Sequence, residues 1–157
     1  MGKIISLIED DVNKIRGDIN LKLYRKGKLI DEIKDHNLVV DTGRRRLAEL
    51  IAGKTNFIIN QIGFGSSNNS ESADDTGLEN QMLFPLRPIE QDGVTSKVEG
   101  LDAIFYFVLY ENEAVGLDIR EFGLFCEDGL MFSHRVRNGS IYKDSDIEIR
   151  GSWTLHF

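Results

Sequence analysis

The side chains of this sequence with the widest chemical repertoire are its three histidines and its single cysteine. His36, His134 and His156 fall in three separate segments, with no i, i+4 pair and no cysteine at the spacing of a zinc site. Their spacing therefore predicts no bound metal. Cys126 is followed by two acidic residues, a setting that suppresses formation of the thiolate nucleophile. These positions predict no catalytic residue and no cofactor.

Carboxylates are concentrated in a polar stretch, residues 66–80, which has almost no apolar side chains. Paired carboxylates carry out glycoside hydrolysis, so a hydrolase would draw its acid and base from this stretch. A calcium role is disfavoured because the spacing lacks the EF-hand register. We expect an exposed loop that is mobile unless a partner holds it. The acidic candidates of this lowest-ranked hypothesis are Glu71, Asp74, Asp75 and Glu79.

Three consecutive arginines, Arg44, Arg45 and Arg46, stand in the first turn of an expected helix. Consecutive helical residues point about 100° apart, so the three side chains do not form one patch by themselves. The helix dipole disfavours cations at this end, which predicts acidic partners in the same chain or in a neighbouring subunit.

The first sixteen residues place apolar side chains at spacings of four, four and three, which line one face of a helix. We expect residues 1–16 to form an amphipathic arm whose stripe packs on its own domain or on another chain. The residues assigned to partner binding are those of this stripe and the arginines: Ile4, Ile8, Val12, Ile15, Arg44, Arg45 and Arg46.

Length and composition indicate one domain over residues 17–157. The chain has 157 residues, 41% of them apolar, and a formal net charge of -7. That charge has the wrong sign for neutralising phosphates, so nucleic acid is a disfavoured partner. A single cysteine excludes an intrachain disulfide. The apolar run at residues 4–8 is shorter than the core of a signal peptide, and no stretch suffices for a membrane span, so no membrane partner is expected.

Alternation of apolar and polar residues dominates the segments after the arm and predicts strands. A hairpin is expected from residue 18 onward around Lys26 and Gly27, and a second one over residues 119–136. A terminal strand over 147–157 is expected to break at Gly151 and to point Phe157 inward. The most apolar run, residues 103–110, predicts a central strand covered on both faces.

One internal α-helix is expected over about residues 43–52, with Asp41 or Thr42 as its N-cap and Gly53 in a left-handed C-cap. Many strands with one internal helix and no βαβ alternation predict a mainly β fold. The expected architecture is an antiparallel β-sandwich or a barrel-like fold.

Two groups of motifs occur in a distinctive order. The first is NLVVDTGRRRLAELIAG at residues 37–53, followed by a strand that ends in Gly63-Phe64-Gly65. The second is DIREFGLF at 118–125, a DG hairpin at 128–135 and IYK at 141–143. This order resembles small tail-associated structural proteins of tailed bacteriophages, including the attachment regions of tail-collar fibre proteins. The motifs are short and degenerate, and their order carries the resemblance.

The resemblance implies a non-enzymatic virion structural protein: an adaptor, collar or fibre-anchoring subunit of the tail, neck or baseplate. It implies homo-oligomers and other phage structural proteins as partners, and no small-molecule substrate. Departures are the three arginines, the strand end Gly-Phe-Gly-Ser and the lack of a fibre shaft after Phe157. The last departure favours a stand-alone adaptor.

The alternative function is a carbohydrate-binding β-sandwich that attaches to a host surface. Exposed aromatic side chains would form its stacking platform. The candidates are Tyr24, Tyr142 and Trp153, although the alternation around Trp153 favours a place in the core.

Overall fold

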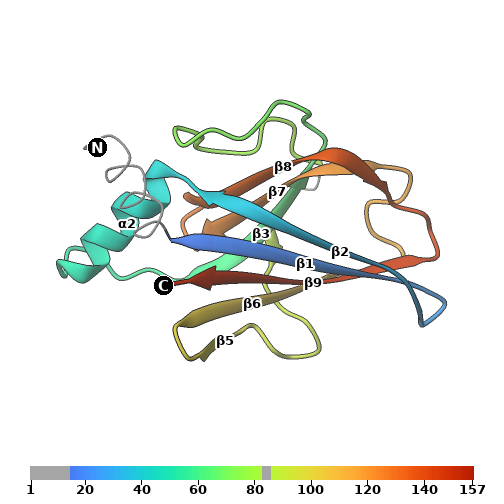
Figure 1. The fold of residues 1–157 in the computed structure, drawn as a ribbon, viewed down its shortest axis with the longest axis horizontal. Helices are drawn as coiled ribbons and strands as arrows, with labels where there is room; N and C mark the ends of the chain where they lie inside the picture. The colour runs from blue at the N-terminus through green and yellow to red at the C-terminus, as the bar shows by residue number, and fades with distance from the viewer. Residues whose placement is uncertain (1–14, 83–85) are drawn as a thin grey trace, which may run out of the picture.

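The computed structural model describes residues 15–82 and 86–157, and Figure 1 shows how they fold. The expected arm lies outside these residues except for Ile15 and Arg16, so the positions of Ile4, Ile8 and Val12 are not described. One antiparallel sheet has the strand order β4-β3-β7-β8-β2-β1-β9-β6-β5. The elements are β1 (Arg16–Arg25), β2 (Lys28–Val39), α2 (Asp41–Ile51), β3 (Ile59–Gly65), β4 (Arg87–Pro88), β5 (Ser96–Glu99), β6 (Asp102–Leu109), β7 (Asp118–Cys126), β8 (Met131–Tyr142) and β9 (Ile147–His156).

The sheet curls into a half-barrel, and β2 joins its two parts (Figure 1). It pairs with β1 along most of its length but with β8 only through Leu38 and Val39. The two parts therefore diverge on either side of this short contact and enclose the core between them. A mainly β, barrel-like fold with one helix is confirmed.

The core is built from the inward positions of strands in both parts. Phe64 of β3 meets Phe107 of β6 at 6.0 Å and Phe122 of β7 at 5.8 Å between ring centroids. Both pairs have the edge-to-face geometry that aromatic rings favour. Trp153 of β9 is fully buried in the same cluster. The aromatic contacts thus tie β6 and β9 to β3 and β7 across the inside of the half-barrel.

The helix begins two residues earlier than expected, and its N-terminus is not capped by a side chain. Val40 is the N-cap residue, and the Thr42 hydroxyl donates instead to the carbonyl oxygen of Met131 at 2.7 Å. Gly43 is buried against the backbone of Phe132, where a Cβ atom would collide with the carbonyl oxygen. Gly43 therefore allows the first turn of the helix to pack closely on β8. The left-handed conformation expected at Gly53 is confirmed, with φ of 68°.

Both expected hairpins are confirmed. The first turns at Lys26 and Gly27, with φ of 50° and 76°, which are the two positive angles of a tight hairpin turn. The second joins β7 to β8 around Gly129, with φ of 85°.

Three details of the strand predictions are wrong. β6 is the second strand from an edge, and its outward side chains Ile104 and Tyr106 are only half-buried. β9 runs unbroken through Gly151, because that glycine makes room for the ring of Phe107 and does not end the strand. Phe157 lies beyond β9 and is 57% exposed.

Both edges of the sheet are short. β4 has two residues. β5 has four residues, and all four are exposed. β5 carries Lys97 and Glu99, which form an ion pair at 2.9 Å.

Candidate functional site

A buried histidine at the sheet surface connects the polar loop to the barrel. His134 lies on β8, opposite Gly123 of β7, where no side chain competes for space. Its Nδ1 lies 2.7 Å from Asp75 of the loop, and its Nε2 lies 2.8 Å from Glu121 of β7. We call these three residues the histidine clasp.

Glu121 is the deepest member of the clasp and has no exposed surface. Its two carboxylate oxygens accept hydrogen bonds from the backbone N–H groups of Glu79 at 2.7 Å and Asn80 at 3.1 Å. Burial raises the pKa of Glu121, but the bonds from His134 and the two amides outweigh it and hold the pKa below its usual range. The carboxylate is therefore ionised and fully engaged.

His134 is held in its charged form by its two neighbours. Burial alone lowers its pKa, but the hydrogen bonds to Glu121 and Asp75 outweigh the burial and raise the pKa above its ordinary value. When protonated, the ring donates from both nitrogens, one to each carboxylate. The clasp thus places the imidazole between two carboxylates that favour its charged form.

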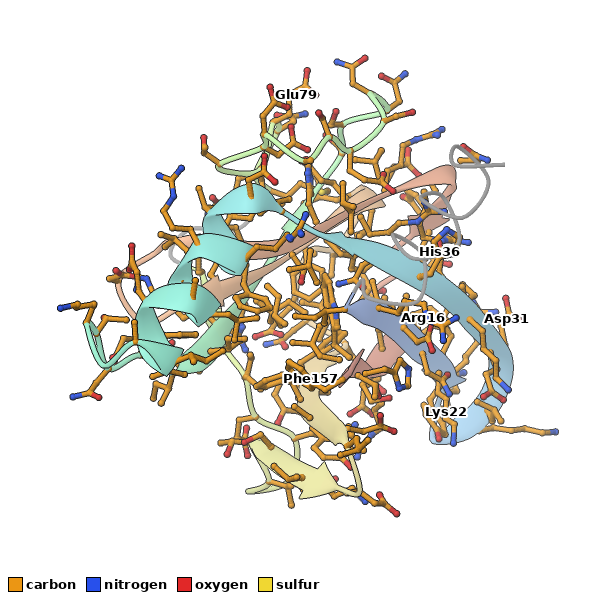
Figure 2. All side chains as sticks on the ribbon, turned by 60° about the vertical axis from the view of Figure 1, so that its left-hand side comes forward. Arg16, Lys22, Asp31, His36, Glu79 and Phe157 are labelled. Atoms are coloured by element: carbon orange, nitrogen blue, oxygen red, sulfur yellow. The ribbon has the colours of Figure 1, made fainter. Side chains whose placement is uncertain are left out.

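A second set of contacts holds the other part of the loop. Glu71 accepts hydrogen bonds from the Arg135 guanidinium at 3.0 Å and from the backbone N–H of Val136 at 2.9 Å. Arg135 also pairs with Asp35 of β2 at 2.9 Å. The loop therefore rests on β7, β8 and β2 through charged groups of its own chain, although it has few apolar side chains. Figure 2 shows Glu79 on this loop, above the sheet.

The hollow beside the clasp has a volume of about 410 Å³ and is lined by His134, Asp75, Glu79 and neighbouring loop residues. The nucleophiles and bases of a hydrolase need groups that are free to attack or to accept a proton. Here both ring nitrogens of His134 are engaged with carboxylates, whereas the hydroxyls of Ser70 and Thr76, which also line the hollow, make no hydrogen bond within the described residues. The contacts of His134 hold the loop on the sheet.

The acidic candidates of the hydrolase hypothesis divide between two roles. Glu71 and Asp75 anchor the loop to the sheet. Asp74 and Glu79 bond to side chains within the loop itself, to Ser72 and to Ser67 and Asn69 respectively. Each of the four carboxylates therefore has a hydrogen-bond partner within the chain.

Cys126 and His156 lie away from the clasp. The thiol is fully buried, and burial, more than the nearby charges, raises its pKa to about 11. His156 stands on the outer face of β9 between Asp102 and Asp18, at 2.7 Å from each. Its pKa is raised by hydrogen bonds to Asp102 and then Asp18.

The residues assigned to partner binding differ in whether they contact their own chain or are exposed. Arg46 is bound within the chain, to Asp128 at 2.8 Å and over the ring of Phe57 at 5.6 Å. Arg44 and Arg45 are exposed and have no ion pair within the described residues. Ile15 is half-buried and packs against the main core.

Sequence reasoning missed the clasp because its members come from three separate segments. One observation in the sequence pointed to it: the charged Glu121 directly precedes an apolar run, residues 122–125. A buried carboxylate needs hydrogen-bond donors, and His134 in the partner strand supplies one.

Within residues 15–82 and 86–157, no group of three or more histidine, cysteine, aspartate or glutamate side chains is arranged to hold a metal ion. In the clasp, the ring nitrogens of His134 point to carboxylates on opposite sides.

Among these same residues, no helix has the length and apolar character needed to span a bilayer. The chain matches no protein-family model, no curated protein and no solved structure.

Proposed function

We propose that this protein is a non-enzymatic structural subunit of a tailed-phage virion, an adaptor, collar or fibre-anchoring protein. In this proposal it packs against further copies of itself and against other proteins of the tail, neck or baseplate. The observation that carries the proposal is the apolar surface at one end of the half-barrel, where β1 begins and β9 ends.

Three strongly exposed apolar side chains lie at this end. The C-terminal end of α2, the turn between β5 and β6 and the end of the chain all lie there (Figure 1). Ile51 is 86% exposed, Leu101 74%, and Phe157, labelled in Figure 2, 57%. Exposed apolar side chains that cluster are typical of surfaces that contact another protein.

A hollow of about 310 Å³ lies at the same end, lined mainly by apolar groups of Ile15, Leu38, Val39 and Ala73. Arg44 lines it as well. An occupant that fits this hollow has an apolar face and acidic groups beside it.

The occupant that we propose is the arm of a neighbouring copy, residues 1–14. Its sequence combines the apolar stripe Ile4, Ile8 and Val12 with three consecutive acids, residues 9–11. The acids complement the guanidinium groups of Arg44 and Arg45, which have no ion pair within residues 15–82 and 86–157. An arm that leaves one subunit and docks on the next is a heterologous contact, which closes into a ring when the rotation between subunits allows it.

The test is the native mass of the full chain, measured by light scattering and native mass spectrometry. We expect a closed oligomer, and we expect a monomer for the variant that lacks residues 1–14 and for the double variant Arg44→Glu, Arg45→Glu. The matched control is Lys28→Glu, an exposed change at the far hairpin, which leaves the mass unchanged.

A full chain that stays monomeric at high micromolar concentration contradicts this packing. The virion role is tested separately by mass spectrometry of purified particles of the phage that encodes the protein. Absence of the chain from those particles overturns the assignment.

A further inference from the structure

A second hollow lies on the outer face of the sheet, across β1, β9 and β6, and has a volume of about 310 Å³. It is separate from the clasp and from the apolar end. Its lining residues, which we call the tyrosine groove, are Asn20, Lys22, Tyr24, Gln91, Tyr106, Arg150, Gly151 and Ser152.

The strand register assembles the floor of the groove. Ser152 of β9 is paired with Asn20 of β1 on one side and with Tyr106 of β6 on the other. Because side chains of a strand alternate between faces, Lys22 and Tyr24 continue the row of Asn20 along β1 on the same outer face. Figure 2 shows Lys22 beside the β1–β2 hairpin.

A tight turn forms one wall. Gln91 and Val94 exchange two backbone hydrogen bonds, at 2.9 and 3.0 Å, around Asp92 and Gly93. Asp92 pairs with Arg150 of β9, which holds the turn on the outer face and brings Gln91 to the groove.

Several polar groups of the groove have no partner among the described residues. Oδ1 of Asn20 is buried and accepts no hydrogen bond. The side chains of Ser152, Gln91, Tyr24 and Lys22 likewise make no hydrogen bond within the described chain. Buried polar atoms normally find a partner, so Oδ1 of Asn20 points to a donor group of a ligand, and the more exposed side chains beside it are free to bond to the same ligand. In the hollow beside the clasp, by contrast, His134, Asp75 and Glu79 already have hydrogen-bond partners within the chain.

The chemistry of these groups selects the ligand. An amide oxygen accepts, while hydroxyl and amide groups both donate and accept, which matches the hydroxyl groups of a sugar. Tyr24 and Tyr106 add aromatic surface to the lining, and the C–H faces of sugar rings pack on such surface. The volume lies at the lower end of the range for ligand sites, which suits one or two sugar units.

Charge argues against an anionic ligand. The guanidinium of Arg150 is neutralised by Asp92 and by Glu148, the latter at 3.1 Å. Lys22 is the one cation of the groove that remains unpaired within the described residues. A phosphate or nucleic-acid site gathers several such cations.

We infer that the tyrosine groove binds a neutral carbohydrate, such as one sugar unit of a polysaccharide. This goes beyond the proposed function and does not depend on it, since a virion subunit and a free protein could each bind a glycan through this face. Tyr24 belongs to the groove, as the carbohydrate hypothesis expected. Trp153 is buried in the core and Tyr142 lies on β8, so the other two platform candidates take no part.

The test is saturation-transfer NMR of the full chain with glucose, galactose, mannose and N-acetylglucosamine, each also offered as a trisaccharide. We expect binding of at least one neutral sugar, with a trisaccharide bound more tightly than its monosaccharide. Tyr24→Ala and Ser152→Val are expected to weaken binding about tenfold or more. Tyr142→Ala is the matched control, because it removes an exposed tyrosine outside the groove, and it is expected to leave affinity unchanged.

Circular dichroism of each variant verifies that the fold is retained. Absence of binding by every neutral sugar at millimolar concentration overturns the inference, as does binding that Tyr24→Ala and Ser152→Val leave intact. Binding of inorganic phosphate or of a thymidine oligonucleotide at this groove in preference to the sugars also overturns it. None of these results changes the oligomer mass, so the two proposals fail independently.

Discussion

Nε2 of His134 lies 2.8 Å from Oε2 of Glu121, and both side chains are buried at the surface where the polar loop meets the sheet. The pair joins β8 to β7, while Glu121 also accepts two backbone N–H groups of the loop. One carboxylate therefore connects two strands and a loop, and its loss has a large expected effect.

Glu121→Gln is expected to lower the free energy of unfolding by about 3–5 kcal/mol, the usual cost of removing one partner of a buried ion pair. The amide leaves the His134 imidazolium without one of its two anions. Urea unfolding measures the change. Asp18→Asn is the matched control, since it removes a carboxylate from the exposed His156 pair, where Asp18 is 63% exposed. We expect less than about 1 kcal/mol there. Equal losses in the two variants would contradict the role of the clasp.

Stability is expected to depend on pH through the same pair. The pKa of His134 is raised above 6.5 in the folded state, so its contribution is fully present below pH 6.5 and is lost as pH rises through the folded pKa. The pKa of Glu121 is lowered below 4.5, so its contribution is present above pH 4.5 and is lost as pH falls through the folded pKa. These two groups therefore stabilise the fold most between pH 4.5 and 6.5.

Urea unfolding from pH 4 to pH 9 measures this profile. We expect His134→Asn to be less stable than the parent chain and to flatten the alkaline side of the profile, where His156 adds a smaller decline because it is more exposed. His36→Asn, at a site with 74% side-chain exposure, is the matched control for replacing a histidine by asparagine. A parent chain whose stability rises from pH 6.5 to pH 9 would refute this reading of the clasp.

Gly151→Ala is expected to destabilise the core by about 1–3 kcal/mol, the usual cost of overpacking. A Cβ atom at this position would collide with the ring of Phe107, which itself packs edge-to-face on Phe64. Gly139→Ala on β8 is the matched control, because a Cβ there meets no atom within 4 Å. Thermal unfolding compares the two variants. A similar melting temperature for both would show that Phe107 moves aside without cost.

The hairpins, the helix and the mainly β architecture were predictable because each depends on local pattern. Alternation around Leu21 and the turn at Gly27 act within a few residues, and the same holds for Gly53 at the end of the helix. The predicted break at Gly151 was wrong because the residue that requires a glycine at this position lies in another strand. The sequence around it permits a break, whereas the position of Phe107 in β6 requires a glycine in an unbroken strand.

The clasp and the tyrosine groove could not be predicted from local sequence pattern, because their residues come from segments that are distant in the sequence. Asp75 and His134 are separated by 59 residues, and only the pairing of β7 with β8 brings Glu121 to the imidazole. Tyr106 sits in the run read as a doubly covered strand, so its outward ring was assigned to a second apolar layer. β6 lies next to the edge strand, and the ring of Tyr106 on its outer face lines the groove.

The two short edges of the sheet limit how this protein can polymerise. A foreign strand added at β4 meets two residues, and at β5 it meets four, two of which carry charge. Strand addition at either edge forms few backbone hydrogen bonds, which disfavours open-ended growth of the kind seen in amyloid. Contacts between subunits at these two edges must therefore rely on side-chain surfaces, which makes them sensitive to single substitutions there.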